Sequence, residues 1–160
     1  MLIGIDPGKS GGVAMVGDGG AFLHGVRMPT VKHGKRDLVD PRSINEALGV
    51  VDDVGGIVTR GIVIEQVGAM PGQGVSSMFN FGRHTGAVEG WALGTGLPVS
   101  WVTPAVWKKH FGLSRDKRAS LDRARLEFGD LKLWDVLAND GIAEAALIAL
   151  WGLRTQKGRA

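Results

Sequence analysis

Short apolar runs separated by glycine-rich turns open the chain, a pattern typical of a β-meander. Leu2–Ile5 and Val13–Val16 are rich in residues with high strand propensity. Ala21–Met28 follows a Gly-Asp-Gly-Gly segment, which is a strong turn signal. The pattern therefore predicts three antiparallel strands at the start of the fold.

Loops, helices and further apolar strands are expected in the rest of the chain. The polar and basic stretch from Pro29 to Asp40 predicts a loop. Ser43 and Glu46 have the spacing of a capping box, which predicts a helix from Ser43 to about Val54. The later elements are expected as a strand at 62–67, a helix at 76–93, a strand at 97–103, and helices at 105–111, 116–128 and 140–153.

The order of these elements predicts an α/β fold. A helix before the strand at 62–67 suits a parallel crossover, because parallel strands need a long connection. We therefore expect a mixed central β-sheet, antiparallel in its first three strands and parallel afterwards, flanked by α-helices. A chain of 160 residues is long enough for one domain, which we place at residues 1–153, with a flexible tail at 154–160.

Composition excludes several classes of protein. The chain has no cysteine, so it has neither disulfides nor a thiolate zinc site. No apolar run reaches the ~18 residues of a membrane span, and we expect no signal peptide. These observations predict a cytoplasmic protein with no membrane partner.

The net charge of +3 is unevenly distributed along the chain. Basic residues cluster at Lys32–Arg36, Lys108–His110 and Arg115–Arg125. Basic clusters around an acidic centre suit a polyanion such as nucleic acid. Solvated surface faces would give the same pattern.

Four carboxylates stand on or beside apolar elements. Asp6 follows the first strand, and Glu65 lies inside the run IVIEQV. Asp140 and Glu144 share one face of the last helix at i,i+4 spacing. Carboxylates are costly to bury without a cation, and oxygen-only ligands from several elements suit Mg²⁺ or Mn²⁺. Two such ions in one site would support phosphodiester hydrolysis.

Most of these acids also have an ordinary structural explanation. Asp6 suits a turn cap, Asp140 suits a helix N-cap, and Glu144 suits a first helical turn, where the dipole favours acids. Glu65 is harder to explain in this way, because a carboxylate inside an apolar strand needs a partner. Asp135 is a spare acid just upstream, expected in a loop.

Four segments together carry a family resemblance. GIDPGKSGG, IVIEQV, TPAVWKKHFGL and DGIAEAALIALWG, in that order and spacing, resemble the RuvC-type Holliday junction resolvases, and the short phage-like branch is the nearer match. The resemblance spans residues 1–153. It implies a ribonuclease H-like fold, a homodimer, and paired Mg²⁺-dependent nicks in four-way or other branched DNA, made with two ions per active site. A phage-encoded protein acting in the host cytoplasm is compatible with it.

Carried over by position, the resemblance makes Asp6 and Glu65 the first two catalytic and metal-binding acids. The bacterial pattern ends with two aspartates at i,i+3 on the last helix. Glu144 matches the second of these, whereas Gly141 occupies the place of the first. Asp140 is the nearest replacement and Asp135 is the alternative, so the identity of the third acid stays open.

The resemblance also gives roles to basic and apolar residues. It places phosphate-contacting lysines after the strand at 97–103, and the expected DNA contacts are Lys9, Lys108, Lys109, Lys117 and Arg118. Met70 and Phe79 are candidates for an apolar wedge at the junction centre, or for a dimer interface. Gly82, Gly86 and Gly90 form a small-residue face that suits close contact with a twin helix, and Trp107 is expected in the core.

Two functions from other classes remain as alternatives. Asp-X-Gly after a first strand also resembles the phosphate loop of actin-like and sugar-kinase-like ATPases, although those need two such domains. A DNA-binding module without catalysis is the other alternative. The four acids favour the nuclease, for which we expect no nucleotide cofactor.

Overall fold

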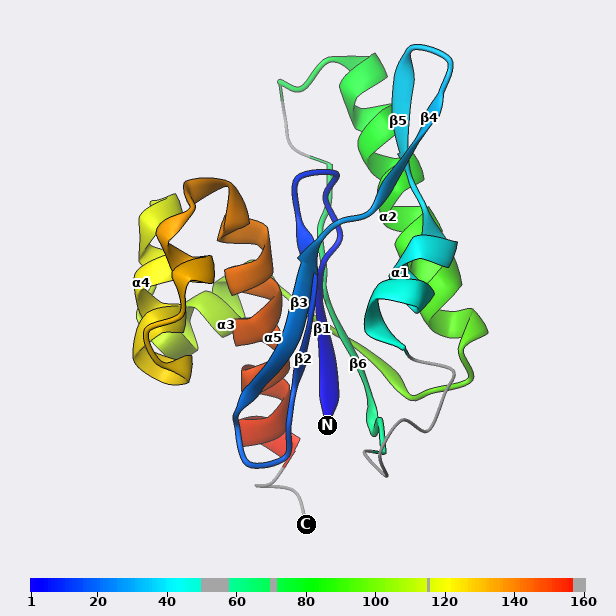
Figure 1. Cartoon of the computed structure of the whole chain (residues 1–160). Coiled ribbons are helices and arrows are strands. Elements are labelled where there is room, and N and C mark those ends of the chain that lie inside the picture. Colours follow the sequence, from blue (N-terminus) through cyan, green and yellow to red (C-terminus); the bar gives the residue numbers. More distant parts are fainter. Residues whose placement is uncertain (50–57, 70–71, 115, 157–160) are drawn as a thin grey trace.

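One mixed sheet lies between two helical layers (Figure 1). The structure is a computed structural model and describes residues 1–49, 58–69, 72–114 and 116–156, with the side chains of Lys117 and Gln156 outside the description. The five strands run in the order β3-β2-β1-β6-β7. Their bounds are β1 Leu2–Asp6, β2 Gly12–Val16, β3 Phe22–Arg27, β6 Gly61–Glu65 and β7 Val99–Val102.

The strand directions confirm the predicted α/β class. β1, β2 and β3 pair in antiparallel fashion, and β1, β6 and β7 pair in parallel. The central strands β1 and β6 are almost wholly buried, as expected of strands covered on both faces. In the parallel register Ile5 lies opposite Ile64, so the residues that follow them, Asp6 and Glu65, end neighbouring strands side by side.

Each face of the sheet has its own helices. α1 (Pro41–Leu48) and α2 (Val75–Gly94) cover one face around Ile3, Ile5 and Ile64. α3 (Pro104–Phe111), α4 (Lys117–Phe128) and α5 (Asp140–Gln156) cover the other. Two short 3₁₀ turns, η2 (Lys132–Asp135) and η3 (Leu137–Asn139), lead into α5. No helix among the described residues is long and apolar enough to cross a bilayer.

The predicted loop at Pro29–Asp40 is wrong, because this stretch forms a hairpin. β4 (Thr30–His33) and β5 (Arg36–Val39) pair as a separate two-stranded sheet. Gly34 has φ +62°, the left-handed conformation that a tight two-residue turn requires. The strands are short, β4 is fully exposed and β5 is buried only at Val39, so the sequence gave no apolar periodicity to detect.

The first helix begins before the predicted Ser43. Asp40 is its N-cap and accepts hydrogen bonds from the backbone N–H of Arg42 (3.2 Å) and the hydroxyl of Ser43 (2.7 Å). Pro41 then occupies the first turn, where a missing N–H costs nothing. The helix ends at Leu48, before Gly49 at φ 57°; the predicted continuation to Val54 falls largely outside the described residues.

The last helix is longer than expected and lies unusually close to the sheet. Residues 154–156, expected in the tail, belong to α5, while 157–160 lie outside the described residues. A Cβ at Gly4 would meet the carbonyl oxygen of Ala145 at 2.0 Å. A Cβ at Gly141 would meet the backbone carbon of Gly11 at 2.5 Å, and one at Gly12 would meet that of Gly141 at 2.7 Å. Glycines thus let the start of α5 touch the turn between β1 and β2.

Substituting Gly141 tests whether this backbone contact determines where α5 lies. Gly141→Ala should lower the free energy of unfolding by about 1–3 kcal/mol, the usual cost of overpacking, and lower Tm by roughly 2–4 °C per kcal/mol. Thermal unfolding by circular dichroism measures it. Gly19→Ala is the matched control, since a Cβ there meets nothing within 4 Å; equal Tm values for the two variants would contradict the contact.

Candidate active site

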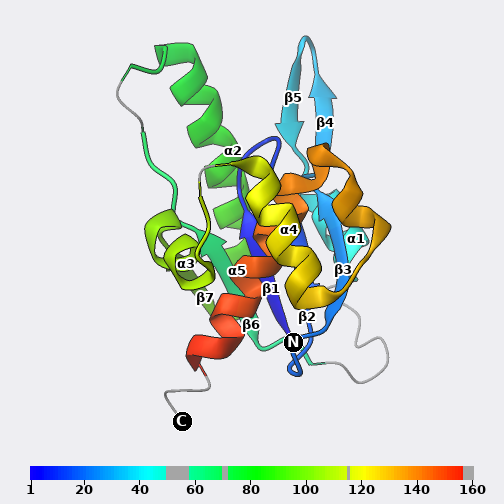
Figure 2. The same ribbon diagram turned by 90° about the vertical axis from the view of Figure 1, so that its left-hand side faces the viewer.

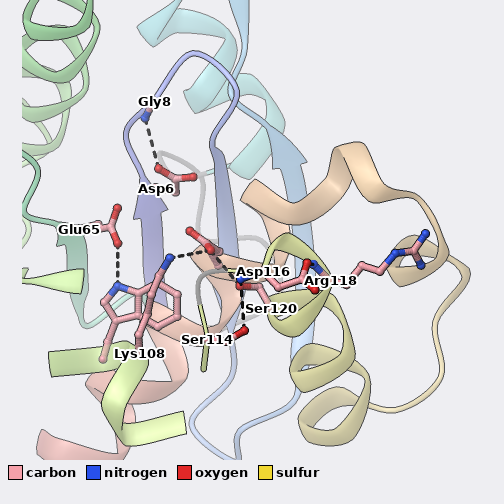
Figure 3. A network of polar contacts seen from close by, with 10 residues as sticks. Asp6, Gly8, Glu65, Lys108, Ser114, Asp116, Arg118 and Ser120 are labelled. Carbon is pink, nitrogen blue, oxygen red and sulfur yellow. Dashed lines mark hydrogen bonds and ion pairs between the residues drawn. The ribbon is translucent and has the colours of Figure 1, made fainter. Parts of the chain in front are cut away.

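Three carboxylates from three elements converge at one end of the sheet, and Figure 3 shows two of them, Asp6 and Glu65. Asp6 ends β1, Glu65 ends the neighbouring strand β6, and Glu144 comes from the second turn of α5. The charges of Glu65 and Glu144 both act on Asp6. The parallel register of β1 and β6 positions the first two acids, and the glycine contacts of α5 position the third.

Asp6 carries an abnormally high pKa. Burial, followed by the charges of Glu65 and Glu144, raises its pKa to about 7. The backbone N–H of Gly8 donates weakly to its Oδ1 at 3.4 Å and opposes the shift. Asp6 therefore exchanges its proton near neutral pH while no cation is bound.

Glu65 is held by an indole. Only 7% of Glu65 is exposed, and Nε1 of the fully buried Trp107 donates a hydrogen bond to its Oε1 at 2.8 Å. Burial raises the pKa of Glu65, the Trp107 hydrogen bond lowers it, and the charge of Glu144 raises it further. Trp107 lies in the core, as predicted, and its polar atom also fixes one oxygen of this acid.

Glu144 is held by side chains of α3 and α4. Its Oε1 accepts hydrogen bonds from Lys108 Nζ at 3.0 Å and from Ser120 Oγ at 2.9 Å. The Lys108 ammonium also lies 5.1 Å from the centroid of the Trp107 ring, within cation–π distance. One network thus joins Glu65, Trp107, Lys108, Glu144 and Ser120 across four elements (Figure 3).

In this network, hydrogen-bond donors of the protein partly offset the negative charge of the carboxylates. In the described part of the chain, no three histidine, aspartate or glutamate side chains are arranged to hold a metal ion as they stand. The donor chemistry of Asp6, Glu65 and Glu144 nevertheless fits a hard divalent cation, since all three present carboxylate oxygens. Their mutual repulsion, which raises the pKa of Asp6 and Glu65, marks negative charge that a cation would relieve.

The two candidates for a further acid lie in different environments. Asp140 is the first residue of α5, next to Gly141 and its contact with the β1–β2 turn. Asp135 lies in η2, where its Oδ1 accepts from Arg125 Nη2 at 2.7 Å in an exposed ion-pair cluster. The structure thus gives Asp135 a cationic partner on α4.

The predicted DNA contacts are spread over several surfaces. Lys9 pairs with Asp37 of β5 at 2.7 Å, and Lys109 is exposed on α3. Lys117 begins α4, and its side chain lies outside the description. Arg118 is exposed and extends away from the acids in Figure 3. Of the predicted basic residues with described side chains, Lys108 is the one hydrogen-bonded to a candidate acid.

One of the two apolar candidates, Phe79, lies on α2. Met70 lies outside the described residues, and Phe79 is 61% exposed with the guanidinium of Arg83 5.7 Å from its ring centroid. A Cβ at Gly82, Gly86 or Gly90 would meet nothing within 4 Å. This glycine face borders a hollow between α2 and the segment after β6, lined in part by Val67, Met78 and Phe81.

Sequence reasoning missed two partners of the acids, the Trp107 indole N–H and the Ser120 hydroxyl. A buried tryptophan needs an acceptor for its N–H, which was a usable signal for Trp107. No comparable signal existed for Ser120, an ordinary serine within a basic helix.

The raised pKa of Asp6 predicts that the free energy of unfolding of the metal-free protein, measured in EDTA, decreases as the pH rises. A carboxyl whose folded pKa lies above its unfolded value of 3.8 destabilises the fold progressively from about pH 4 to 7, and fully above pH 7. Asp6→Asn, which keeps an acceptor for Gly8, should therefore raise Tm over wild type at pH 8 by roughly 2–4 °C or more. The difference should largely vanish at pH 4. Equal Tm differences at both pH values would contradict the shift.

Known structures share this fold. The chain is similar to RuvC from Thermus thermophilus in complex with a Holliday junction substrate, with 23% identity, a TM-score of 0.61, and coverage of 98% of this chain and 96% of that chain. A second Thermus thermophilus RuvC structure gives 21% identity, a TM-score of 0.56 and the same coverage. No protein-family model and no curated protein sequence matches the chain. The chain therefore has the ribonuclease H-like fold expected from its motifs, the fold of the RuvC structures.

Proposed function

We propose that this chain is a Holliday junction resolvase, an endodeoxyribonuclease that makes paired nicks in four-way DNA junctions. The convergence of Asp6, Glu65 and Glu144 at one end of a ribonuclease H-like sheet carries the proposal. The similarity to a protein solved with a Holliday junction substrate, which spans 98% of the chain, supports it. Lys9, in the turn that follows Asp6, and Lys108, which is hydrogen-bonded to Glu144, are cations near these acids that suit a phosphate backbone.

Mg²⁺, with Mn²⁺ as a substitute, is the proposed cofactor. Two ions per active site would be held by Asp6, Glu65, Glu144 and Asp140, whose oxygens are the ligands these ions prefer. When bound, two such ions activate a water nucleophile and stabilise the leaving oxygen. No nucleotide cofactor is proposed.

The chain's own residues keep the acids in place for this chemistry. Trp107 fixes Oε1 of Glu65, so the orientation of that carboxylate is set before substrate arrives. Lys108 and Ser120 both bond Oε1 of Glu144. The Lys108 ammonium is therefore already positioned in the acidic site, where it can balance the charge of an entering phosphodiester.

The other basic and apolar residues have proposed roles in binding the branched DNA. Lys9, Lys109, Lys117 and Arg118 would contact phosphates. Phe79 and Met70 would approach the junction centre as apolar groups. The protein would act in the cytoplasm, and a phage origin is consistent with this.

A nicking assay tests the proposed reaction. With Mg²⁺ and synthetic four-way, Y-shaped and linear DNA, wild type should nick the four-way junction in pairs. Asp6→Asn and Glu65→Gln should abolish nicking and retain junction binding in Ca²⁺. Glu144→Gln and Asp140→Asn should each lose most of the nicking activity, because each would remove a proposed metal ligand.

Asp135→Asn is the matched control for the last helix, since Asp135 is paired with Arg125, and it should nick normally. Normal nicking by Asp6→Asn or Glu65→Gln would refute the assignment. Junction binding without nicking by wild type would instead favour a non-catalytic DNA-binding module. Turnover of ATP would favour the kinase-like alternative.

We also propose that the active form is a homodimer, because a two-fold symmetric junction needs two active sites and a C2 dimer supplies them. The open glycine face of α2 and the hollow beside it are the proposed contact. Sedimentation should give about twice the 16.9 kDa chain mass at micromolar protein. Gly86→Arg should shift it to monomer, while Gly19→Arg should not. A wild-type monomer, with and without junction DNA, would rule the dimer out.

A further inference from the structure

The β4–β5 hairpin extends beyond the main sheet as a separate ribbon (Figures 1 and 2). Every residue of β4, Thr30–His33, is exposed, and so are the turn residues and Arg36 at the start of β5. No core cluster formed by the described residues includes the outer half of the ribbon; Val39, at its base, is the ribbon residue buried there. Its outer part therefore contributes little to folding.

The ribbon is basic at its outer end. Lys32, Lys35 and Arg36 carry permanent positive charge, and His33 lies among them. The acidic residue of the ribbon, Asp37, forms ion pairs with Nζ of Lys32 at 2.6 Å and with Nζ of Lys9 at 2.7 Å. Hydrogen bonds from Lys32 and Lys9 lower the pKa of Asp37 to about 2, so this carboxylate stays ionised and is neutralised internally. Lys35 and Arg36 at the outer end are left to act on a partner.

The base of the ribbon is fixed beside the acids. Lys9, which pairs with Asp37, belongs to the turn that follows Asp6. The backbone N–H of Met28 donates to the carbonyl of Gly11 in the same turn at 3.0 Å. His84 of α2 forms a hydrogen bond with the carbonyl of Asp37 at 3.1 Å. The ribbon is therefore held to the end of the sheet where the carboxylates converge.

We propose that the β4–β5 ribbon is a second DNA-contacting element, which binds the phosphates of a duplex arm next to the acid site. The inference rests on the proposed function. Two paired strands lie about 4.8 Å apart, and a two-stranded ribbon is narrow enough to enter the ~12 Å wide major groove of DNA. Lysine and arginine contacts to phosphates carry no sequence information, so the element adds affinity for an arm of any sequence.

Removing the outer cations tests the proposal by binding. Lys35→Ala/Arg36→Ala keeps Gly34 and therefore the turn. In Ca²⁺, its affinity for a four-way junction should fall, and the slope of log K against log salt should decrease in magnitude by about 0.9 per lost phosphate contact, up to ~1.8. The same loss is expected on a linear duplex with the sequence of one arm, measured at low salt. Arg60→Ala is the control, because it removes an exposed cation beside β6, at the opposite end of the sheet.

The outcomes separate the ribbon from the nuclease. Wild type that neither binds nor nicks junctions overturns the proposed function. The ribbon proposal alone fails if wild type binds and nicks junctions but the ribbon variant has the same affinity and salt slope as Arg60→Ala. If the variant loses affinity for the four-way junction but binds the linear duplex as wild type does, the proposed contact with a duplex arm is also rejected. Near-ultraviolet circular dichroism of each variant checks that the fold is retained.

Discussion

Backbone packs directly on backbone where α5 meets the turn between β1 and β2. Gly12 and Gly141 leave no room for a side chain at this contact, and an isolated bridge pairs Gly11 with Gly141. Gly4 extends the contact along the helix, against Ala145 and Ala149. Because Asp6 precedes the turn and Glu144 lies one helical turn beyond Gly141, the distance between these two acids depends on the glycine contact. The geometry of the candidate site therefore depends on how closely α5 packs on the β1–β2 turn.

The three acids are compensated to different degrees by the protein itself. Hydrogen bonds to charged groups are each worth about 1.5–3 kcal/mol, and Glu144 accepts two through one oxygen. Glu65 accepts one from a buried indole. Within the described part of the chain, the hydrogen bond to Asp6 is a long backbone contact of 3.4 Å, and Asp6 is the acid whose pKa burial and its neighbours raise to about 7. The least compensated charge therefore lies at the end of β1, between the other two elements.

The sequence predicted the parts of the fold that leave a local pattern. The β-branched runs of β1 and β6 and the apolar periodicity of α5 identified the sheet, its central helix and the acids on them. The partners of those acids were not predictable from local pattern. Trp107 is 42 residues from Glu65, and Lys108 is 36 residues from Glu144. Only the folded chain brings such residues together.

Where the prediction failed, the cause was weak burial. The ribbon of β4 and β5 has two strands of four residues, with Val39 as its buried residue, which is too short a pattern to reveal it. The helix start was predicted at Ser43 because Ser43 and Glu46 match a capping box. In the structure Asp40 is the N-cap, and its carboxylate accepts hydrogen bonds from the Arg42 backbone N–H and the Ser43 hydroxyl. Both errors lie on the surface, where several local arrangements of the same residues have similar free energies.

The contact between Gly11 and Gly141 also constrains how such a sequence can change. A side chain at position 141, including an aspartate, has no space while the β1–β2 turn keeps its path, since the Gly11 backbone lies 2.5 Å from the added Cβ. Relocation of the turn would in turn change the surroundings of Lys9 and the root of the ribbon. A side chain at position 11 is excluded for a different reason, because its Cβ would lie 2.2 Å from the carbonyl oxygen of Asp6. Divergence at position 141 therefore requires a change in the path of the turn that carries Gly11.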